Sequence, residues 1–556
     1  MTAAVLKNSV AMVKTDKGES MQKNEVYEVE ITGMTDEGDG VGRVNSMAVF
    51  IPYTLPGERV RIIIVKVLKH YAFGKLLEVL KPSLHRVKAE CPYFYQCGGC
   101  QLWHMDLEAE LNYKRQKVQD CLTRIAGLDI EVEPTLAPGE RLRYRNKAQF
   151  PVTSAGIGLF RRNSHTVIPV EDCLIQGKWN MEIISVVQGW MKKYEIPPYD
   201  EERDSGFLRN IYTREGESGI LVTLVTRERK FPHPDALVQE LRALEIPIVG
   251  ILQNINLKKT NVVLGTEMRI LWGEKELTDR IGHVKFHISP LSFYQVNAEG
   301  TLCLYETVRE FAGLSGKEVL WDLYCGIGTI GLFLASEVKR LAGIEIVPEA
   351  VENARTNARL NGIENAEYYC GKAEKLAPSL MREGGRPDVV ILDPPRKGCD
   401  AALLDTVLKA APRRIVYVSC KPSTLARDLK ILAAGGYGVR RAIPVNMFPC
   451  SAHVETVVKL VRKTPDAYID ITVDMDELDL TTSEAKVTYQ KIKDYIEEKY
   501  DVKVSSLYIA QVKQKYGIIE RKNYNTAKSK NVRQPQCPPE KEKLIEEAMR
   551  HFKMIS

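Results

Sequence analysis

Hydrophobic and polar positions alternate along the first 80 residues of the chain. Between Val26 and Val79 the runs VYEVEITGM, MAVFIP, ERVRIIIVKVLK and YAFGKLLEVL are separated by turn-forming residues. Alternation with period two predicts half-buried strands, and four or five short strands in succession are typical of a small OB-like β-barrel. The glycine-rich stretch 36–42 precedes a strand rather than a helix, so it predicts a hairpin turn and not a phosphate-binding loop.

Basic residues interleaved with an aromatic residue accompany the last strands of this predicted barrel. The pattern is compatible with an RNA-binding face and equally with a solvated barrel surface, and both interpretations stay open. The segment resembles a TRAM domain, an RNA-binding module that precedes some RNA-modifying domains. The residues concerned are Lys66, Lys69, His70, Tyr71, Lys75 and Lys81.

The pattern becomes mixed over residues 83–288. Repeated strand and turn signals, with a helical pattern near 235–244, predict an α+β domain. Within it, the stretch RLRYRNK at 141–147 alternates basic residues with Tyr144 and is predicted to be a strand. Such a strand either follows a phosphate backbone, with the tyrosine as a stacking face, or is a solvated sheet edge.

From about residue 289 strands alternate with helices, which is typical of a doubly wound, Rossmann-like α/β domain. Residues 319–331 read as a strand, a glycine turn and a helix, and the next strand ends at Glu345. Two further apolar runs end at Asp393 and Cys420. Because ligands bind beyond the carboxyl ends of such strands, these side chains are candidates for one site. The glycine spacing departs from GxGxxG and better matches an adenosylmethionine-binding loop.

Four cysteines form the second candidate site. Cys97 and Cys100 make a CxxC turn around two glycines, Cys91 lies six residues upstream of it, and Cys173 lies far downstream. Four thiolates are suited to zinc or to a [4Fe–4S] cluster. One CxxC with two separate thiols favours the cluster, because zinc sites usually pair two such turns. Zinc and an unliganded core remain alternatives.

Composition narrows the class of protein only slightly. The 556 residues suffice for three or four domains, and 78 basic against 72 acidic residues give a formal net charge of +6. This charge permits a nucleic-acid partner without requiring one. No apolar window approaches 18 residues, the first residues lack the apolar core of a signal peptide, and 12 cysteines are too sparse for a disulfide scaffold. A cytoplasmic protein with no membrane segment is therefore expected.

Specific motifs in the α/β region carry a closer resemblance. Together with the barrel and the four cysteines, they make residues 23–462 resemble the bacterial RNA uracil-C5 methyltransferases, specifically the 23S ribosomal RNA branch with an iron–sulfur cluster. The motifs are SFYQVN at 292–297, DLYCGIGT at 322–329, DPPRKG at 393–398, SCKPSTLARDL at 419–429 and HVETVV at 453–458.

The resemblance implies a covalent mechanism acting on a flipped uridine. It makes Cys420 the nucleophile that adds to carbon 6 of uracil and Glu455 the base that removes the carbon 5 proton. His453 is a poorer candidate for the base. Arg396 stands where amino-group methylases carry an aromatic residue, and Cys399 lies beyond the Asp-Pro-Pro motif, so uracil is favoured over an exocyclic amine or cytosine.

The resemblance also implies two bound groups. S-adenosyl-L-methionine is expected as methyl donor, with Glu345 at its ribose and Lys372 at the position that often contacts adenine. The four cysteines are expected to hold the [4Fe–4S] cluster in a structural role. The residues expected to bind the methyl donor are Gln295, Tyr324, Thr329, Glu345 and Asp393, and the expected cluster ligands are Cys91, Cys97, Cys100 and Cys173.

The expected organisation is therefore a multidomain monomer that binds 23S ribosomal RNA. A tRNA uracil-C5 methyltransferase and a catalytically silent RNA-binding or ribosome-assembly factor are the alternatives. After the family pattern, two helical runs with a short connection resemble a helix-turn-helix. The predicted segments are a TRAM-like barrel at 23–82, a central RNA-binding domain with the cluster at 83–288, a class I α/β methyltransferase domain at 289–462, an acidic linker at 463–485 and a small α-helical appendage at 486–556.

Overall fold

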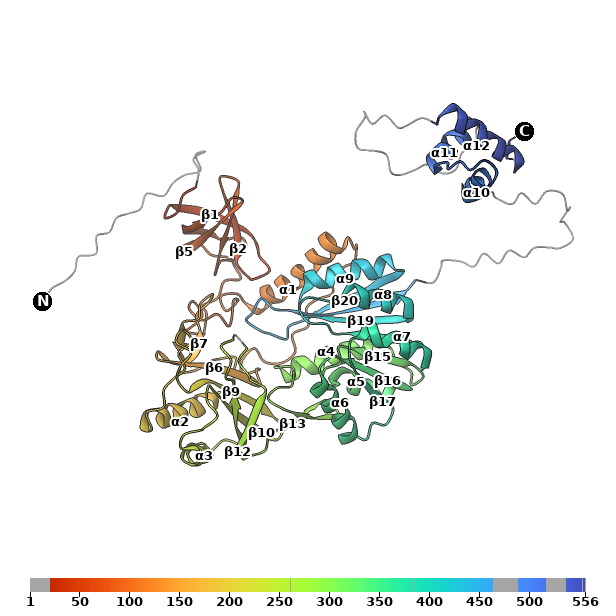
Figure 1. The fold of residues 1–556 in the computed structure, drawn as a ribbon. Coiled ribbons are helices and arrows are strands. Elements are labelled where there is room, and N and C mark those ends of the chain that lie inside the picture. Colours follow the sequence, from red (N-terminus) through yellow and green to blue (C-terminus); the bar gives the residue numbers. More distant parts are fainter. Residues whose placement is uncertain are drawn as a thin grey trace. The chain divides into compact units, whose positions relative to one another are not determined.

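The computed structural model describes residues 21–260, 262–383, 385–463, 489–516, 537–552 and 554–555. The chain divides into two compact units, Met1–Asp466 and Ala467–Ser556, which are described separately (Figure 1). Apart from Lys463, the predicted acidic linker lies outside the described residues. Within the described ranges, no helix is both long enough and apolar enough to cross a membrane.

The first element of the large unit is a closed five-stranded barrel with strand order β1-β2-β3-β5-β4. Alternate side chains such as Val49, Ile51 and Ile62 are fully buried inside it, as the period-two pattern predicts. Thr35 N–H donates to the Asp39 carbonyl (2.8 Å) in the predicted hairpin turn. The strands are β1 (Val26–Met34), β2 (Gly40–Val44), β3 (Met47–Ile51), β4 (Arg59–Val67) and β5 (Tyr71–Lys81).

A seven-stranded sheet with strand order β12-β11-β10-β9-β6-β7-β8 forms the central region. Helices α2 (Asn180–Lys193) and α3 (Pro234–Arg242) pack on it through buried residues such as Trp190 and Leu237 (Figure 1). The strands are β6 (Lys147–Thr153), β7 (Gly156–Phe160), β8 (Val167–Pro169), β9 (Leu208–Gly216), β10 (Gly219–Thr226), β11 (Ile248–Ile255) and β12 (Glu267–Gly273).

The strand predicted at 141–147 is wrong, because β6 begins only at Lys147. Arg143 has φ of 57°, a left-handed conformation that a strand does not contain. Its guanidinium donates to both carboxylate oxygens of Asp172 (2.7 and 2.6 Å) and to the Cys173 carbonyl (2.9 Å). Internal contacts of this basic residue therefore fix an irregular backbone.

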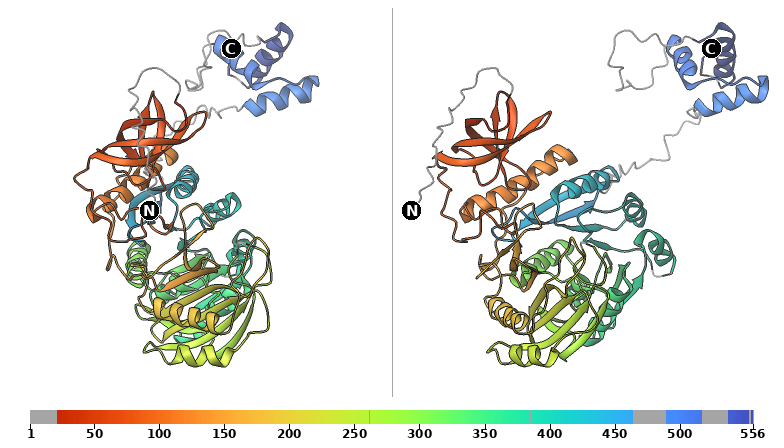
Figure 2. Two further views of the ribbon diagram at one scale, coloured as in Figure 1. Left: turned by 90° about the vertical axis from the view of Figure 1, so that its left-hand side faces the viewer. Right: turned by 60° about the vertical axis from the view of Figure 1, so that its left-hand side comes forward.

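Helix α1 (Leu107–Cys121) packs on the C-terminal α/β region, although it precedes the central sheet in the sequence. Asp106 caps it by accepting from Ala109 N–H (2.8 Å), and one π-helical turn, Leu122–Ala126, ends it. Tyr113 of α1 also donates to the Thr35 carbonyl of the barrel (2.8 Å). Helix α1 thus contacts both the barrel and the C-terminal region (Figure 2).

A hairpin of β13 (Leu277–Ile281) and β14 (Val284–Ile288) leads into the doubly wound domain that the sequence predicts. Its sheet has the order β17-β16-β15-β18-β19-β21-β20, with hydrophobic clusters on both faces. Only β21 runs antiparallel to its neighbours. The elements are α4 (Ala298–Ala312), β15 (Val319–Leu323), α5 (Thr329–Leu334), β16 (Arg340–Glu345), α6 (Pro348–Leu360), β17 (Ala366–Cys370), α7 (Ala373–Glu383), β18 (Val389–Leu392), α8 (Ala401–Ala410), β19 (Arg414–Ser419), α9 (Pro422–Ala434), β20 (Tyr437–Val445) and β21 (Glu455–Arg462).

The second unit contains three described helices, α10 (Tyr489–Tyr500), α11 (Ser506–Lys515) and α12 (Pro539–His551). They enclose a small apolar core that includes Ile496 and Ile509. Two helices with a short connection agree with the predicted pattern. The predicted start at residue 486 lies outside the described residues.

Candidate functional site

The strand ends of the doubly wound sheet bring three predicted side chains together. The β19–β21 ladder ends at the pair Ser419 and Thr456, so the next residues on these neighbouring strands are Cys420 and Glu455. Asp393 follows β18, which pairs with β19 on its other side. Directly opposed residues of adjacent antiparallel strands lie about 5 Å apart. The thiol and the carboxyl groups therefore converge at one sheet edge.

A cavity of about 750 Å³ lies at this edge. Lys372 lines it, at the position expected near adenine. Thr329 does not line it: this residue begins α5, and its hydroxyl accepts a hydrogen bond from the Tyr305 hydroxyl (2.7 Å). The other predicted residues of the site all line the cavity, namely Gln295, Tyr324, Glu345, Asp393, Cys420 and Glu455.

Several lining residues were not predicted as site residues. Phe293 and Phe448 are aromatic, and Arg145 and Arg396 are basic. Phe293 is 71% exposed, which is unusual for a large apolar side chain and suits a stacking face for a planar ligand. The sequence signal that could have identified Phe293 was its position inside the SFYQVN motif. Arg145 lies in the RLRYRNK stretch, for which contact with a phosphate backbone was one interpretation, but it was not assigned to this cavity.

Burial dominates the protonation of Cys420. It raises the pKa of the thiol to about 11, and the nearby carboxyl groups of Glu455 and Asp393 act in the same direction. The guanidinium of Arg396 opposes them. The thiol is therefore neutral at pH 7 in the ligand-free cavity. A nucleophilic role requires that the proton leave as a substrate binds.

The pKa values of two carboxyl groups of the site are also raised. Burial raises the pKa of Asp393 to about 7. Burial, aided by the charge of Asp393, raises the pKa of Glu455 well above its usual range, while Arg396 lowers it. Carboxyl groups with raised pKa values are suited to accept a proton during a reaction near neutral pH.

The glycine turn after β15 shapes the other end of the cavity. Gly328 has φ of 83°, and a Cβ there would lie 2.7 Å from the Tyr368 hydroxyl, so only glycine fits. The Glu345 carboxylate accepts hydrogen bonds from the N–H groups of Ile346 (2.7 Å) and Gly326 (3.2 Å). Val347 N–H also donates to this carboxylate (2.9 Å), so three bonds fix Glu345 beside the turn and its Oε2 keeps one acceptor position for a ligand hydroxyl.

Asp322, directly before the turn, has one unsatisfied carboxylate oxygen. Its Oδ2 accepts from Gly331 N–H (2.9 Å), but the buried Oδ1 has no partner. Burial, opposed by the Gly331 hydrogen bond, raises the pKa of this carboxyl to about 7. A buried acceptor without a donor is costly in the free protein. The cavity volume, the Glu345 carboxylate and the glycine turn fit a ligand that carries hydroxyl and amino donors.

The four predicted metal-ligating cysteines line a second cavity, of about 730 Å³. All four are free thiols. In the part of the chain that the structure describes, no group of three or more His, Cys, Asp or Glu side chains is arranged to hold a metal ion. Four thiols facing one cavity nevertheless match the donor set of thiophilic metals. Arg145 lines both cavities.

Comparisons with known proteins agree with this arrangement. The family model described as tRNA (Uracil-5-)-methyltransferase matches residues 235–463, and the TRAM domain model matches residues 21–77. An uncharacterized RNA methyltransferase of Halalkalibacterium halodurans is 47% identical over 450 residues, which cover 80% of this chain and 98% of that protein. One from Clostridium tetani is 44% identical over 444 residues, 79% of this chain and 96% of the relative.

A solved structure is similar over most of the large unit. It is the tRNA (uracil-54, C5)-methyltransferase of Pyrococcus abyssi in complex with S-adenosyl-L-homocysteine. The two chains are 29% identical with a TM-score of 0.65, and the match covers 78% of this chain and 100% of the other.

Proposed function

The chain belongs to the TRAM-containing RNA (uracil-5-)-methyltransferase family, and we propose that it methylates carbon 5 of a uridine in 23S ribosomal RNA through Cys420 and Glu455. The observation that carries the proposal is the register of β19 and β21, which sets the thiol beside the carboxyl group inside one cavity. S-adenosyl-L-methionine supplies the methyl group from its sulfonium.

Carbon 5 of uracil is a poor nucleophile and needs activation. The Cys420 thiolate adds to carbon 6 and forms an S–C bond, so that carbon 5 gains enolate character. Carbon 5 then takes the methyl group. Glu455 removes the carbon 5 proton, and the resulting elimination breaks the S–C bond and returns the thiolate. The protein thus supplies one thiolate and one base, and the S–CH3 bond of the donor, which would break as carbon 5 gains the methyl group, leaves a neutral thioether.

The charges around Cys420 and Glu455 support these roles. Arg396 lowers the pKa values of both groups and so favours the ionised thiol and the ionised base. The same positive charge suits the oxygen of the enolate. The raised pKa of Glu455 increases its affinity for the proton that it receives.

The methyl donor is proposed to occupy the part of the cavity between the glycine turn and Asp393. Glu345 is assigned to the ribose hydroxyls, and Gln295 and Tyr324 to the amino acid end and the sulfonium. Thr329 is assigned an indirect role, because its hydroxyl is bonded to Tyr305 and does not line the cavity. Phe293 is assigned to stack on the flipped base.

RNA binding by the barrel is supported by its exposed aromatic cluster. The Tyr71 ring lies 5.3 Å from that of Phe50 and 5.6 Å from that of Phe73, measured between centroids, and Tyr71 is exposed at the surface. Lys69 and Lys75 flank it in the sequence. Aromatic faces next to basic side chains are typical of single-stranded RNA sites.

The cysteine cavity is proposed to hold a [4Fe–4S] cluster with a structural role, because methyl transfer moves no net electrons. Protein purified without oxygen is expected to be brown and to contain about four irons per chain. Cys173→Ser should lower the iron content while adenosylmethionine binding persists. Colourless protein with one zinc per chain would replace this assignment with a zinc site.

The deciding experiment uses RNA that contains 5-fluorouridine. Fluorine cannot leave as a proton, so the covalent adduct accumulates in the presence of the methyl donor. A denaturation-resistant band with 23S rRNA fragments, absent for Cys420→Ala, is expected. No band with any RNA, despite bound methyl donor, would favour a silent RNA-binding factor.

A tRNA substrate is the second candidate, favoured by the similarity to the Pyrococcus abyssi enzyme. The same assay with unmodified tRNA transcripts separates the two substrates. A band with tRNA and none with rRNA fragments would assign this chain to tRNA. The cysteine set and the resemblance to the ribosomal RNA branch are the reasons for placing rRNA first.

A further inference from the structure

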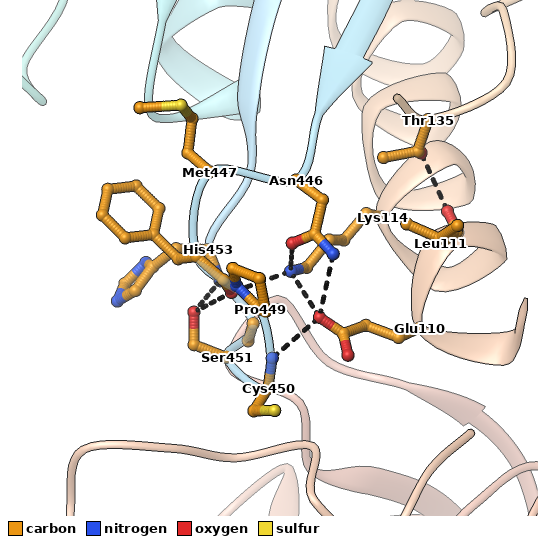
Figure 3. Close-up of polar contacts among 12 residues, drawn as sticks. Glu110, Leu111, Lys114, Thr135, Asn446, Met447, Pro449, Cys450, Ser451 and His453 are labelled. Carbon is orange, nitrogen blue, oxygen red and sulfur yellow. Dashed lines mark hydrogen bonds and ion pairs between the residues drawn. The ribbon is translucent and has the colours of Figure 1, made fainter. Parts of the chain in front are cut away.

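Glu110 and Lys114 form an ion pair on α1 whose side chains are both fully buried (Figure 3). Lys114 Nζ donates to Glu110 Oε1 (2.8 Å), to Asn446 Oδ1 (2.5 Å) and to the Phe448 carbonyl (3.0 Å). Its three N–H donors thus have three acceptors. Two of the acceptors belong to a loop more than 300 positions further along the chain.

Glu110 contacts the same loop as a hydrogen-bond acceptor. Its Oε1 accepts from Cys450 N–H (2.9 Å), and its Oε2 accepts from Arg141 (2.8 Å). Cys450 has φ of 65°, which costs a non-glycine residue on the order of 1 kcal/mol or more. The hydrogen bond to Glu110 therefore supports a strained point of the loop backbone.

The loop in question, residues 446–454, joins β20 to β21 and ends one residue before Glu455. Its backbone carbonyl groups accept hydrogen bonds from side chains and N–H groups of four other segments. The bonds run from Asn297 Nδ2 to Met447 (3.1 Å), from the Tyr144 hydroxyl to Pro449 (3.3 Å), from Gln101 N–H and Leu102 N–H to Cys450 (3.0 and 2.9 Å) and from Lys117 Nζ to Ala452 (3.0 Å).

Stability alone does not account for the buried charges. Desolvating an ion pair costs several kcal/mol per ion, and apolar side chains of similar size are often as stable. Burial lowers the pKa of Lys114 despite the neighbouring Glu110 carboxylate, which shows that the site disfavours the charge. An apolar pair would fill the space but would leave the loop carbonyl and amide groups without partners.

We propose that Glu110 and Lys114 are positioning residues that set loop 446–454, and through it Glu455, against the target uracil. This inference rests on the proposed function. The loop supplies Phe448 and His453 to the cavity and leads directly into the base. Cys420 directly follows β19 and lies outside the loop. Loss of the ion pair therefore affects proton removal more than thiol addition.

The test compares two RNAs with the full-length chain and its Lys114→Met variant. With 5-fluorouridine RNA, which reports addition and methylation, the variant is expected to form the adduct within about threefold of the wild-type rate. With ordinary uridine RNA, methylated covalent adduct should accumulate because elimination is slow, and turnover should fall about tenfold or more. Glu455→Gln gives the adduct level expected when the base is removed.

Arg441→Met is the matched control. Arg441 lies on β20 and pairs with Glu133 and Glu310, so the variant also removes ion pairs from the strand that precedes the loop, without touching the loop. It should accumulate no adduct. Glu110→Gln keeps an acceptor for Cys450 N–H and should fall between wild type and Lys114→Met, and it replaces that variant if the latter does not fold.

The outcomes distinguish the proposed function from the positioning role of Glu110 and Lys114. A wild-type protein that traps no 5-fluorouridine RNA overturns the proposed function. A wild-type protein that traps RNA, with a folded Lys114→Met variant that loses both reactions equally or neither, overturns the positioning role alone. Selective accumulation of the uridine adduct supports it.

Discussion

Cys420 and the four clustered cysteines lie in two cavities of nearly equal volume, about 750 and 730 Å³, and the surroundings of their thiols differ. Cys420 follows a buried strand and shares its cavity with the buried carboxyl group of Glu455 and with the half-buried residue Asp393. The cysteine cavity contains one carboxylate, Asp172, which pairs with Arg143 and is partly exposed.

The difference matches the two roles proposed for cysteine in this chain. Covalent catalysis needs a thiol and a base that ionise only when the reaction requires it. Burial of acidic groups serves this purpose, although it lowers the stability of the folded protein. Binding a soft metal needs several thiols and no base, and irregular segments can supply them. The buried acids, rather than the cysteines, distinguish the catalytic cavity from the other one.

The largest effect is expected for Cys420→Ala. Without the thiol, carbon 5 is not activated, and methyl transfer should fall by about ten-thousand-fold or more. The measurement is single-turnover transfer of a radiolabelled methyl group to RNA. Cys121→Ala, which removes a thiol outside both cavities, is the control and should retain activity. Comparable losses for both variants would show that the loss is not specific to the Cys420 thiol.

Asp393→Asn is expected to stabilise the protein above neutral pH while it reduces methyl transfer. The folded pKa, about 7, exceeds the ordinary value of 3.8, so the folded state binds the extra proton and loses stability as pH rises from about 4 to 7. Three pKa units correspond to about 4 kcal/mol. The unfolding free energy at pH 8 should therefore increase, and the difference should vanish near pH 4.

Asp428→Asn is the matched control for that variant. Asp428 is fully buried, but its carboxylate accepts hydrogen bonds from Cys399 N–H (2.7 Å) and the Tyr417 hydroxyl (2.6 Å). Its replacement should lower the unfolding free energy at pH 8. A decrease for Asp393→Asn as well would mean that burial does not destabilise the catalytic carboxylate.

Most residues that line the cavity at Cys420 could be brought together from the sequence, because the strand ends of an α/β sheet place residues that are distant in sequence at one edge. Cys420, Glu455 and Glu345 follow or begin apolar runs whose topology is common to the fold. Thr329 shows the limit of this reasoning. It lies in the right turn, but a contact with Tyr305, 24 positions away, occupies its hydroxyl, and no local pattern reveals that contact.

The buried pair on α1 shows the same limit more strongly. Glu110 and Lys114 are four residues apart on a helix, the spacing of an ordinary exposed ion pair. They are buried because loop 446–454 covers them, 332 positions further along in the case of Asn446. Likewise, the RLRYRNK stretch has the alternation of a strand, but the Arg143–Asp172 pair fixes a different backbone.

The rate of adduct formation at Cys420 is expected to change about a hundredfold with pH. With a thiol pKa of about 11, the thiolate fraction rises tenfold per pH unit, so adduct formation with 5-fluorouridine RNA should rise about a hundredfold from pH 6.5 to 8.5. Arg396→Met should slow the reaction at each pH, because the guanidinium lowers this pKa. A profile that is flat above pH 7 would mean that bound RNA already removes the proton.

The smallest effect is expected for Asp172→Asn in the cysteine cavity. The Asp172 carboxylate makes two hydrogen bonds to Arg143 (2.7 and 2.6 Å), but both side chains are about one-third exposed. Pairs so accessible to solvent contribute about 1 kcal/mol or less, so the unfolding free energy should fall only slightly and methyl transfer should stay within about twofold of wild type. The asparagine variant of the catalytic cavity, Asp393→Asn, is expected to change stability in the opposite direction and to lose activity. The measurement is thermal unfolding at pH 8. Equal changes in the two variants would show that the surroundings of the two carboxyl groups affect stability in the same way.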